Sequence, residues 1–234
     1  MHKQKLIHND KSVILSNIRE VVFGLEDGMV STLGAISGIA VGTGSHFAVI
    51  LSGLVIIAVE SISMGLGAFL SNSSEKALDR RKLREERLQI THNPEKEKLE
   101  LKKFYLKDGW SKELAQAMSD YAGRRPKLLL KEMVNRELKI CASPTYPFKR
   151  GVIMFFAYIL GGLIPLASYF FIPLSQAIYF SIGFTLTGLF ILGAAVGKLS
   201  FGNWLRNAFR MLIVGGLALS IGLIISQLSQ RFIN

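Results

Sequence analysis

The distribution of charge along the chain is the feature that most restricts its fold. Residues 151–197 contain no charged side chain, whereas lysine and arginine are concentrated at the extreme N-terminus and between residues 72 and 150. A stretch of about 20 mostly apolar residues can cross the hydrocarbon core of a bilayer as a helix. Five stretches meet that length, at residues 21–44, 47–70, 151–172, 174–197 and 208–229. The sequence therefore predicts an all-α, polytopic membrane protein with five transmembrane helices.

The composition agrees with a membrane protein and argues against other classes. Of the 234 residues 50% are hydrophobic, the mean hydropathy is +0.35 and the formal net charge is +11. A basic balance alone is also typical of nucleic-acid binding, but its segregation away from the apolar stretches favours a membrane and no nucleic-acid partner. Cys141 is the only cysteine, which excludes an intrachain disulfide and a paired-cysteine metal site.

The loop lengths and their charges predict an orientation. Ser45 and His46 join the first two spans and a turn at Pro173 joins the third and fourth, so both short turns lie on one side. The opposite side receives the basic N-terminus and the basic segment from 72 to 148, which makes it cytoplasmic by the positive-inside rule. Five spans then leave the C-terminus outside. We expect an integral protein of a prokaryotic plasma membrane, because the chain is compact.

The charged segment between spans two and three is predicted to be a cytoplasmic three-helix insert. Asn93 with Pro94, Ser111 and Pro126 are typical helix starts, and Gly109 and Gly123 are typical helix ends. We expect three parts: residues 1–71 with helices one and two, residues 72–148 as a helical metal-binding domain, and residues 149–234 with helices three to five.

Ionisable side chains inside the predicted spans indicate a transport pathway. Glu26 and Asp27 lie near the cytoplasmic end of the first span and Glu60 lies near the middle of the second. A charge at such depth costs a few kcal/mol, roughly, so it usually lines a cavity or pathway. Met64 follows Glu60 by four residues and shares its helix face, and a carboxylate with a thioether suits a borderline transition metal. Packing of Met64, and a headgroup contact of Glu26, are the alternatives.

Glycines in the first span predict close helix packing. They form small-xxx-small patterns, which let neighbouring helices approach, either within one subunit or between two. The five glycines are Gly24, Gly28, Gly34, Gly38 and Gly42.

The insert carries a second set of candidate metal ligands. Glu97 and Glu100 are three residues apart, and Met133 and Glu137 four apart, so each pair shares one face of its helix; Glu86 precedes them on another helix. Carboxylates from facing helices bind metal in di-iron bundles. A solvated charged surface is the alternative, and spacing does not decide between the two.

The chain resembles the vacuolar iron transporter family. The resemblance rests on NIREVVFGLEDGMVSTLGAISGIAVG, VESISMGLGAFLSNSSEKAL, NPEKEKLELKKFYLKDGWSKELA and PFKRGVIMFFAYILGGLIPL, and it covers nearly the whole chain. It implies a five-span homodimer with the ion path at the dimer interface, which exchanges Fe²⁺ or Mn²⁺ for protons, and a cytoplasmic metal-binding domain.

The resemblance also implies roles for individual residues. Asp27 and Met64 match the intramembrane metal ligands of the family, and the matching cytoplasmic metal-binding positions are Glu86, Glu97, Glu100, Met133 and Glu137. Two positions depart from the family pattern. Ile56 and Gln89 stand where relatives carry glutamate; we expect Glu60 to replace the first acid, and Gln89 to keep an oxygen ligand at the metal site without its charge.

These observations predict a function and leave one alternative open. We expect a proton antiporter that exports Fe²⁺, or Mn²⁺, from the cytoplasm, in which protonation of Asp27 or Glu60 releases the ion. The alternative is a membrane protein that binds metal for sensing or storage without transport. No enzyme motif occurs and the four histidines are scattered, so we expect neither an enzyme nor a prosthetic group.

Overall fold

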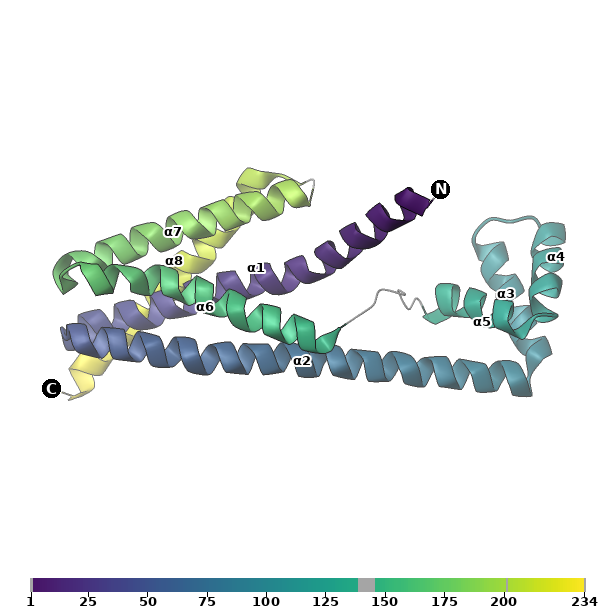
Figure 1. Ribbon diagram of the computed structural model, residues 1–234, viewed down its shortest axis with the longest axis horizontal. Coiled ribbons are helices and arrows are strands. Elements are labelled where there is room, and N and C mark those ends of the chain that lie inside the picture. The colour runs from purple at the N-terminus through teal and green to yellow at the C-terminus, as the bar shows by residue number, and fades with distance from the viewer. Residues whose placement is uncertain (1, 139–145, 201, 234) are drawn as a thin grey trace. The chain divides into compact units, whose positions relative to one another are not determined.

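The computed structural model describes residues 2–138, 146–200 and 202–233, with side chains between Asn17 and Arg231 (Figure 1). Within these ranges the chain is helical and has no strand, which confirms the all-α prediction. Cys141 lies outside the described residues. The elements are α1 (His2–Thr43), α2 (His46–His92), α3 (Pro94–Lys107), α4 (Lys112–Gly123), α5 (Pro126–Met133), the π-helical η1 (Val134–Leu138), α6 (Pro147–Phe171), α7 (Leu174–Leu199) and α8 (Trp204–Ile233).

The chain divides into two compact units. Unit 1 comprises residues 1–70 and 146–234, and unit 2 comprises residues 71–145. The long helix α2 contributes its first half to unit 1 and its second half to unit 2, since it has no Gly or Pro between residues 68 and 92 to end it.

Four described helices are long and apolar enough to cross a membrane: α2, α6, α7 and α8. Helix α1 has the length but is not among them, because Glu26 and Asp27 lower the hydropathy of its apolar part. The structure therefore supports an integral membrane protein with four apolar spans, and a fifth span in α1 stays a prediction.

The glycines of α1 form two packing seams inside unit 1. A Cβ added at Gly24 would lie 2.7 Å from the Cβ of Ala157 in α6, and one at Gly38 would lie 2.6 Å from the carbonyl oxygen of Gly222 in α8. Either distance is too short for a real Cβ contact, so glycine is required for these helices to approach. The predicted close packing is thus present within one subunit.

Unit 2 is a small bundle with its own apolar core. The core side chains come from α2, α3, α4 and α5, and they are Ile90, Leu101, Tyr105, Ala115, Ala122, Leu129 and Met133. The predicted helix starts at Pro94, Ser111 and Pro126 are confirmed within a residue. Ser111 caps α4 by accepting a hydrogen bond from the backbone N–H of Leu114. Asn93 is the N-cap residue of α3, as predicted, but its side chain makes no capping hydrogen bond.

Candidate functional site

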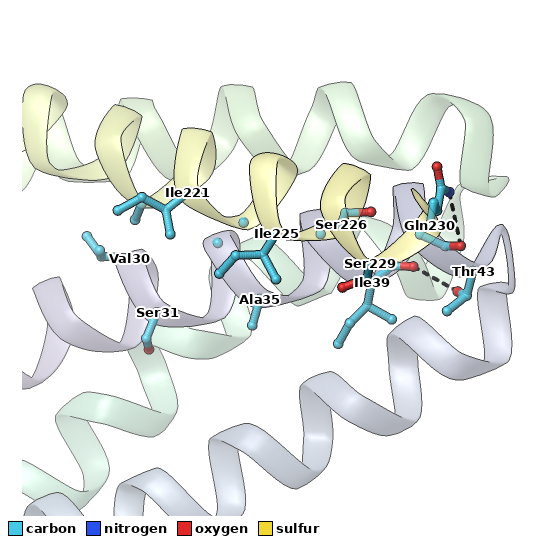
Figure 2. A pocket seen from close by; sticks show the side chains of 15 residues that line it. Val30, Ser31, Ala35, Ile39, Thr43, Ile221, Ile225, Ser226, Ser229 and Gln230 are labelled. Atoms are coloured by element: carbon cyan, nitrogen blue, oxygen red, sulfur yellow. Dashed lines mark hydrogen bonds between the residues drawn. The ribbon is translucent and has the colours of Figure 1, made fainter. Parts of the chain in front are cut away.

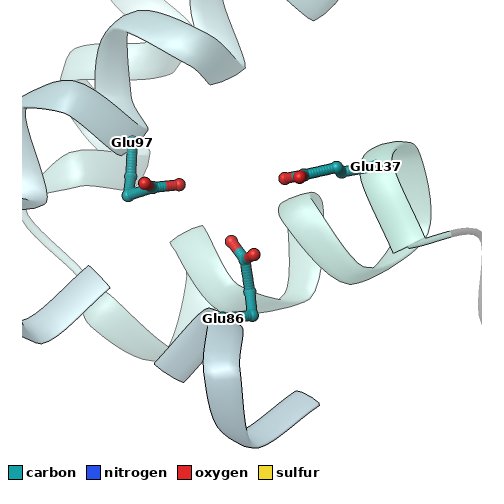
Figure 3. A group of neighbouring side chains, drawn as sticks. All are labelled: Glu86, Glu97 and Glu137. Atoms are coloured by element: carbon teal, nitrogen blue, oxygen red, sulfur yellow. The ribbon is translucent and has the colours of Figure 1, made fainter. Parts of the chain in front are cut away.

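Three glutamates of unit 2 converge from three separate segments. Glu86 lies on α2, Glu97 on the first turn of α3 and Glu137 on η1, and one carboxylate oxygen of each lies within 4.8 Å of the other two (Figure 3). Oxygens at that separation are close enough to share one cation of the size of a divalent metal ion. We call these three residues the acidic cluster.

The acidic cluster is largely withdrawn from water. Glu86 is 3% exposed and Glu97 is 1% exposed, while Glu137 stands at the open side. One oxygen of Glu86 and one of Glu97 have no hydrogen-bond partner in the described structure. A buried carboxylate oxygen without a partner costs free energy. The geometry therefore fits a cation as the missing partner.

Burial and mutual repulsion raise the pKa values of the carboxylates in the acidic cluster. The pKa of Glu86 is raised to about 7, first by burial and then by the charges of Glu137, Glu97 and Glu100. Burial likewise raises the pKa of Glu97 and of Glu137, with Glu100 as the next cause in both. Carboxylates that repel one another bind protons more tightly, and a divalent cation relieves the same repulsion.

The other predicted ligands of the insert lie in different settings. Glu100 is half-buried and close enough to affect the protonation of all three cluster members. Gln89 is exposed. Met133 is fully buried in the apolar core beside Leu129, so the described side chain is a packing residue of unit 2. Met133 and Glu137 do not share one environment, because the chain changes from α-helix to the wider π-helix at Val134.

Unit 1 brings two of the predicted pathway residues together. Asp27 on α1 is half-buried and Glu60 on α2 is exposed, and their charges are close enough to interact. Glu26, the neighbour of Asp27, is also half-buried. Met64 is half-buried one turn beyond Glu60, next to Gly65, where a Cβ would lie 3.1 Å from the carbonyl oxygen of Gly151. Three acids and a thioether therefore belong to α1 and α2 of the same unit.

Two polar residues near Asp27 were missed by the sequence analysis. The hydroxyl of Ser31 donates to the backbone carbonyl of Asp27 at 2.7 Å, and its oxygen lies 2.6 Å from the hydroxyl of Tyr158. Since Ser31 has one proton to donate, the Tyr158 hydroxyl is the donor in the second bond. Ser31 follows Asp27 by four residues, a spacing that marks one helix face, whereas no local pattern singles out Tyr158.

A groove leads away from this region along α1 and α8. It has a volume of about 690 Å³, begins at Val30 and Ser31, and ends at Thr43 and Gln230 (Figure 2). Gly34 and Gly38 are among the residues that line it, and most of the lining is apolar, including Ile221. At the far end the Gln230 side chain donates hydrogen bonds to the carbonyls of Val41 and Gly42, at 3.1 and 3.2 Å.

These features define a class of protein. Glu60 lies on α2, which is apolar enough to span a membrane, and its charge interacts with that of Asp27 on α1. A helical unit of the same chain brings three more carboxylates together, two of them buried. Such an arrangement is that of an integral membrane protein which handles cations.

The particular family follows from sequence comparison. Residues 18–227 match the sequence profile of the VIT family, so the chain belongs to the VIT family, whose members are membrane transporters and not enzymes. It is 28% identical to vacuolar iron transporter 1 of Arabidopsis thaliana over 98% of this chain and 94% of that protein. It is 28% identical to vacuolar iron transporter 1 of Tulipa gesneriana, over 90% and 87%, and 30% identical to a vacuolar iron transporter of Toxoplasma gondii, over 93% and 76%. The resemblance seen in the sequence is thereby confirmed.

Proposed function

We propose that this protein exports Fe²⁺, or Mn²⁺, from the cytoplasm in exchange for protons. The observation that carries the proposal is the buried acidic cluster, which offers oxygen ligands and negative charge to a divalent cation. Relatives named vacuolar iron transporters support iron as the ion. Family membership supports transport rather than binding alone.

The proposed topology has five spans, with α1 as the fifth. Glycine seams hold α1 against α6 and α8, two helices that are themselves apolar enough to cross a membrane. A helix packed between spans lies in the membrane even when two carboxylates lower its hydropathy. The N-terminus and the metal-binding domain of residues 72–148 are then cytoplasmic and the C-terminus is outside, in a prokaryotic plasma membrane.

The proposed cycle uses the two sets of carboxylates in sequence. The acidic cluster, helped by Glu100 and Gln89, collects the ion from the cytoplasm. The ion then passes to Asp27, with Glu60 and Met64 as the other ligands and Glu26 at the inner end. A proton that arrives from outside neutralises Asp27 or Glu60 and so weakens its hold on the cation, which is released. Glu60 takes the place of the acid that Ile56 lacks, since residues four apart share a helix face.

We propose a homodimer with the ion path between the subunits. The groove of α1 and α8 supports this, because its largely apolar lining favours burial against a second copy. Asp27 and Ser31 lie on the same face of α1 that continues into the groove. A second copy seated there would enclose Asp27 and Glu60 and withdraw Glu60 from the lipid.

Transport into proteoliposomes tests the proposal. Wild-type protein is expected to take up Fe²⁺ and Mn²⁺ along a pH gradient, and Asp27→Ala is expected to abolish the uptake. Glu113→Gln is the control, because Glu113 is an exposed carboxylate outside both acidic sites. Stoichiometric metal binding without any flux would contradict transport and favour the alternative, a protein that binds metal for sensing or storage.

A further inference from the structure

The third carboxylate of the acidic cluster is held by a different kind of element from the other two. Glu86 and Glu97 lie on α-helices and are buried, whereas Glu137 lies on the π-helical turn η1 and is exposed. None of the five residues of η1 is buried, so this turn adds no buried side chain to the apolar core of unit 2. Burial in the core therefore does not fix the position of Glu137.

Mutual repulsion acts against the observed position of Glu137. One of its carboxylate oxygens lies within 4.8 Å of an oxygen of Glu86 and of an oxygen of Glu97 (Figure 3). Like charges at that separation repel, and the exposed side chain is the one that is free to move into solvent. A contact that restrains η1 therefore keeps the three ligands together before a cation arrives.

Arg136, the neighbour of Glu137 on η1, makes such a contact. Its guanidinium Nη1 pairs with Oδ2 of Asp108, the C-cap residue of α3. Its Nε donates a hydrogen bond of 3.2 Å to Oε2 of Glu132 on α5. The side chain of Arg136 is 26% exposed, so water screens these two ion pairs only in part.

A buried tyrosine completes the surroundings of Arg136. Tyr105 belongs to the apolar core, and the guanidinium carbon of Arg136 lies 4.4 Å from the centre of its ring. The Tyr105 hydroxyl donates to the same Oε2 of Glu132 at 3.3 Å. The planar guanidinium bonds two carboxylates and stacks on an aromatic ring at once, which the single ammonium of lysine does not do. Arg136 thereby joins η1 to α3, the helix whose first turn carries Glu97.

Resting on the proposed function, we propose that Arg136 is a positioning residue for the metal site of the insert. It anchors η1 to α3 and α5, and so keeps the carboxylate of Glu137 within reach of an ion that Glu86 and Glu97 bind. The guanidinium has no acceptor atom and is not itself a ligand. Contacts that orient a metal ligand change metal affinity about 10- to 100-fold when they are removed.

The charge of Arg136 on its own leads to the opposite prediction. A positive charge on the residue next to a ligand repels a cation at the acidic cluster. If this repulsion were its main influence, Arg136→Gln would tighten Mn²⁺ binding. If Arg136 positions Glu137, the same substitution weakens binding. The sign of the change in affinity therefore separates the two effects.

General support of the fold is the other rival role. If Arg136 supports unit 2 as a whole, its removal also displaces Glu86 and Glu97, and it weakens binding whether or not Glu137 is present. If Arg136 acts through Glu137, its removal has no further effect once that carboxylate is gone. A double-mutant cycle with Glu137→Ala therefore distinguishes positioning from general support.

The test measures Mn²⁺ binding to the full-length protein in detergent by calorimetry. Arg136→Gln and Glu137→Ala are each expected to lower the affinity of the insert about tenfold or more, and the double variant should match Glu137→Ala. Arg80→Gln is the matched control, because Arg80 is an exposed arginine of the same unit. Its affinity should stay within about twofold of wild type.

Asp108→Asn tests the same contact from the other side, also where Arg136→Gln does not fold. Asp108 is exposed at the end of α3 and forms one of the two ion pairs of Arg136. Its substitution is expected to lower Mn²⁺ affinity about threefold in wild type and not at all in Glu137→Ala.

The outcomes separate this inference from the proposed function. Unchanged or tighter Mn²⁺ binding in Arg136→Gln overturns the inference, and so does a loss of equal size in wild type and in Glu137→Ala for either substitution. The acidic cluster then still stands as the metal site. If Glu137→Ala leaves the affinity of the wild type unchanged, the inference and the capture step of the proposed function both fail.

Discussion

The two acidic regions of the molecule differ in how complete they are within one chain. In unit 2 three carboxylates from three segments already meet, and the two on α2 and α3 are almost fully buried. In unit 1 Asp27 and Glu60 interact, but Asp27 is half-buried and Glu60 is exposed. The fold of unit 2 alone brings its carboxylates together, whereas the acids of unit 1 remain partly or fully exposed on α1 and α2.

This difference indicates different tasks. A preassembled cluster of repelling carboxylates binds a cation tightly and suits capture from a dilute pool. A transport site has to release its ion as well as bind it, so fewer ligands and an open side are useful. The comparison therefore separates affinity, which we assign to the insert, from translocation, which we assign to the membrane helices.

Removing the carboxylate of the membrane region should have the largest effect. Asp27→Asn is expected to lower Mn²⁺ flux about a hundredfold or more, because the cation loses its charged ligand at depth. Metal binding by the insert, measured on the same protein in detergent by calorimetry, should remain at the wild-type level. Loss of both Mn²⁺ flux and Mn²⁺ binding by the insert would contradict separate roles, since it would mean that the two regions act as one site.

Weakening the acidic cluster should reduce affinity more than maximal rate. Glu86→Gln is expected to lower Mn²⁺ affinity about 10- to 100-fold, as a charged ligand contributes roughly 1.5 to 3 kcal/mol. Flux at saturating Mn²⁺ should stay within about threefold of wild type, since capture is no longer limiting. Glu113→Gln, which removes an exposed carboxylate of the same insert, should change neither quantity. An equal loss of flux at saturating ion would place the insert directly in the translocation path.

Raising the pH should lower the stability of the metal-free insert and raise its affinity for metal. The pKa of Glu86 is raised to about 7 from its usual value of 4.5, so the metal-free insert favours the protonated form. The contribution of Glu86 to the stability of the metal-free insert is therefore fully present below pH 4.5 and is lost as pH rises through about 7. Metal affinity increases over the upper part of the same range, because the carboxylate ionises. Hydrogen exchange of residues 94–138 with and without Mn²⁺ between pH 5 and 8 measures both. If protection from exchange changed with pH in the same way with and without Mn²⁺, the assignment of the raised pKa of Glu86 to the metal site would be contradicted.

Restoring the missing acid of the insert should have the smallest effect. Gln89 is exposed and three residues after Glu86 on α2. Gln89→Glu is expected to tighten Mn²⁺ binding about threefold, because an exposed charge contributes less than about 1 kcal/mol. Gln89→Ala serves as the control for loss of the amide oxygen. A gain of a hundredfold would show that this position belongs inside the acidic cluster.

The sequence predicts the features of this fold that depend on local patterns. Apolar length identified α2, α6, α7 and α8, and turn chemistry placed the helix starts at Pro94, Ser111 and Pro126. The glycine spacing of α1 indicated close packing but left its partners open, because a pattern on one helix does not name the helix that meets it. The partners are α6 and α8.

The residues that sequence analysis missed depend on contacts between distant segments. Tyr158 reaches Ser31 across 127 positions, and Arg136 reaches Asp108 across 28. The π-helical turn at Val134–Leu138 also carries no signal in the spacing of Met133 and Glu137. Glu86, Glu97 and Glu137 were predicted as ligands, and the structure brings them together; their role in binding metal remains a prediction.

The most direct test of the central claim uses a pH gradient as the only driving force. Proteoliposomes with an acidic interior are supplied with Mn²⁺ at equal free concentration on both sides, and internal Mn²⁺ and pH are followed together. Our account predicts accumulation of Mn²⁺ against its own gradient, coupled to loss of internal protons and abolished by a protonophore. Equal Mn²⁺ on both sides throughout, with metal bound to the protein but none accumulated, would contradict proton-coupled transport.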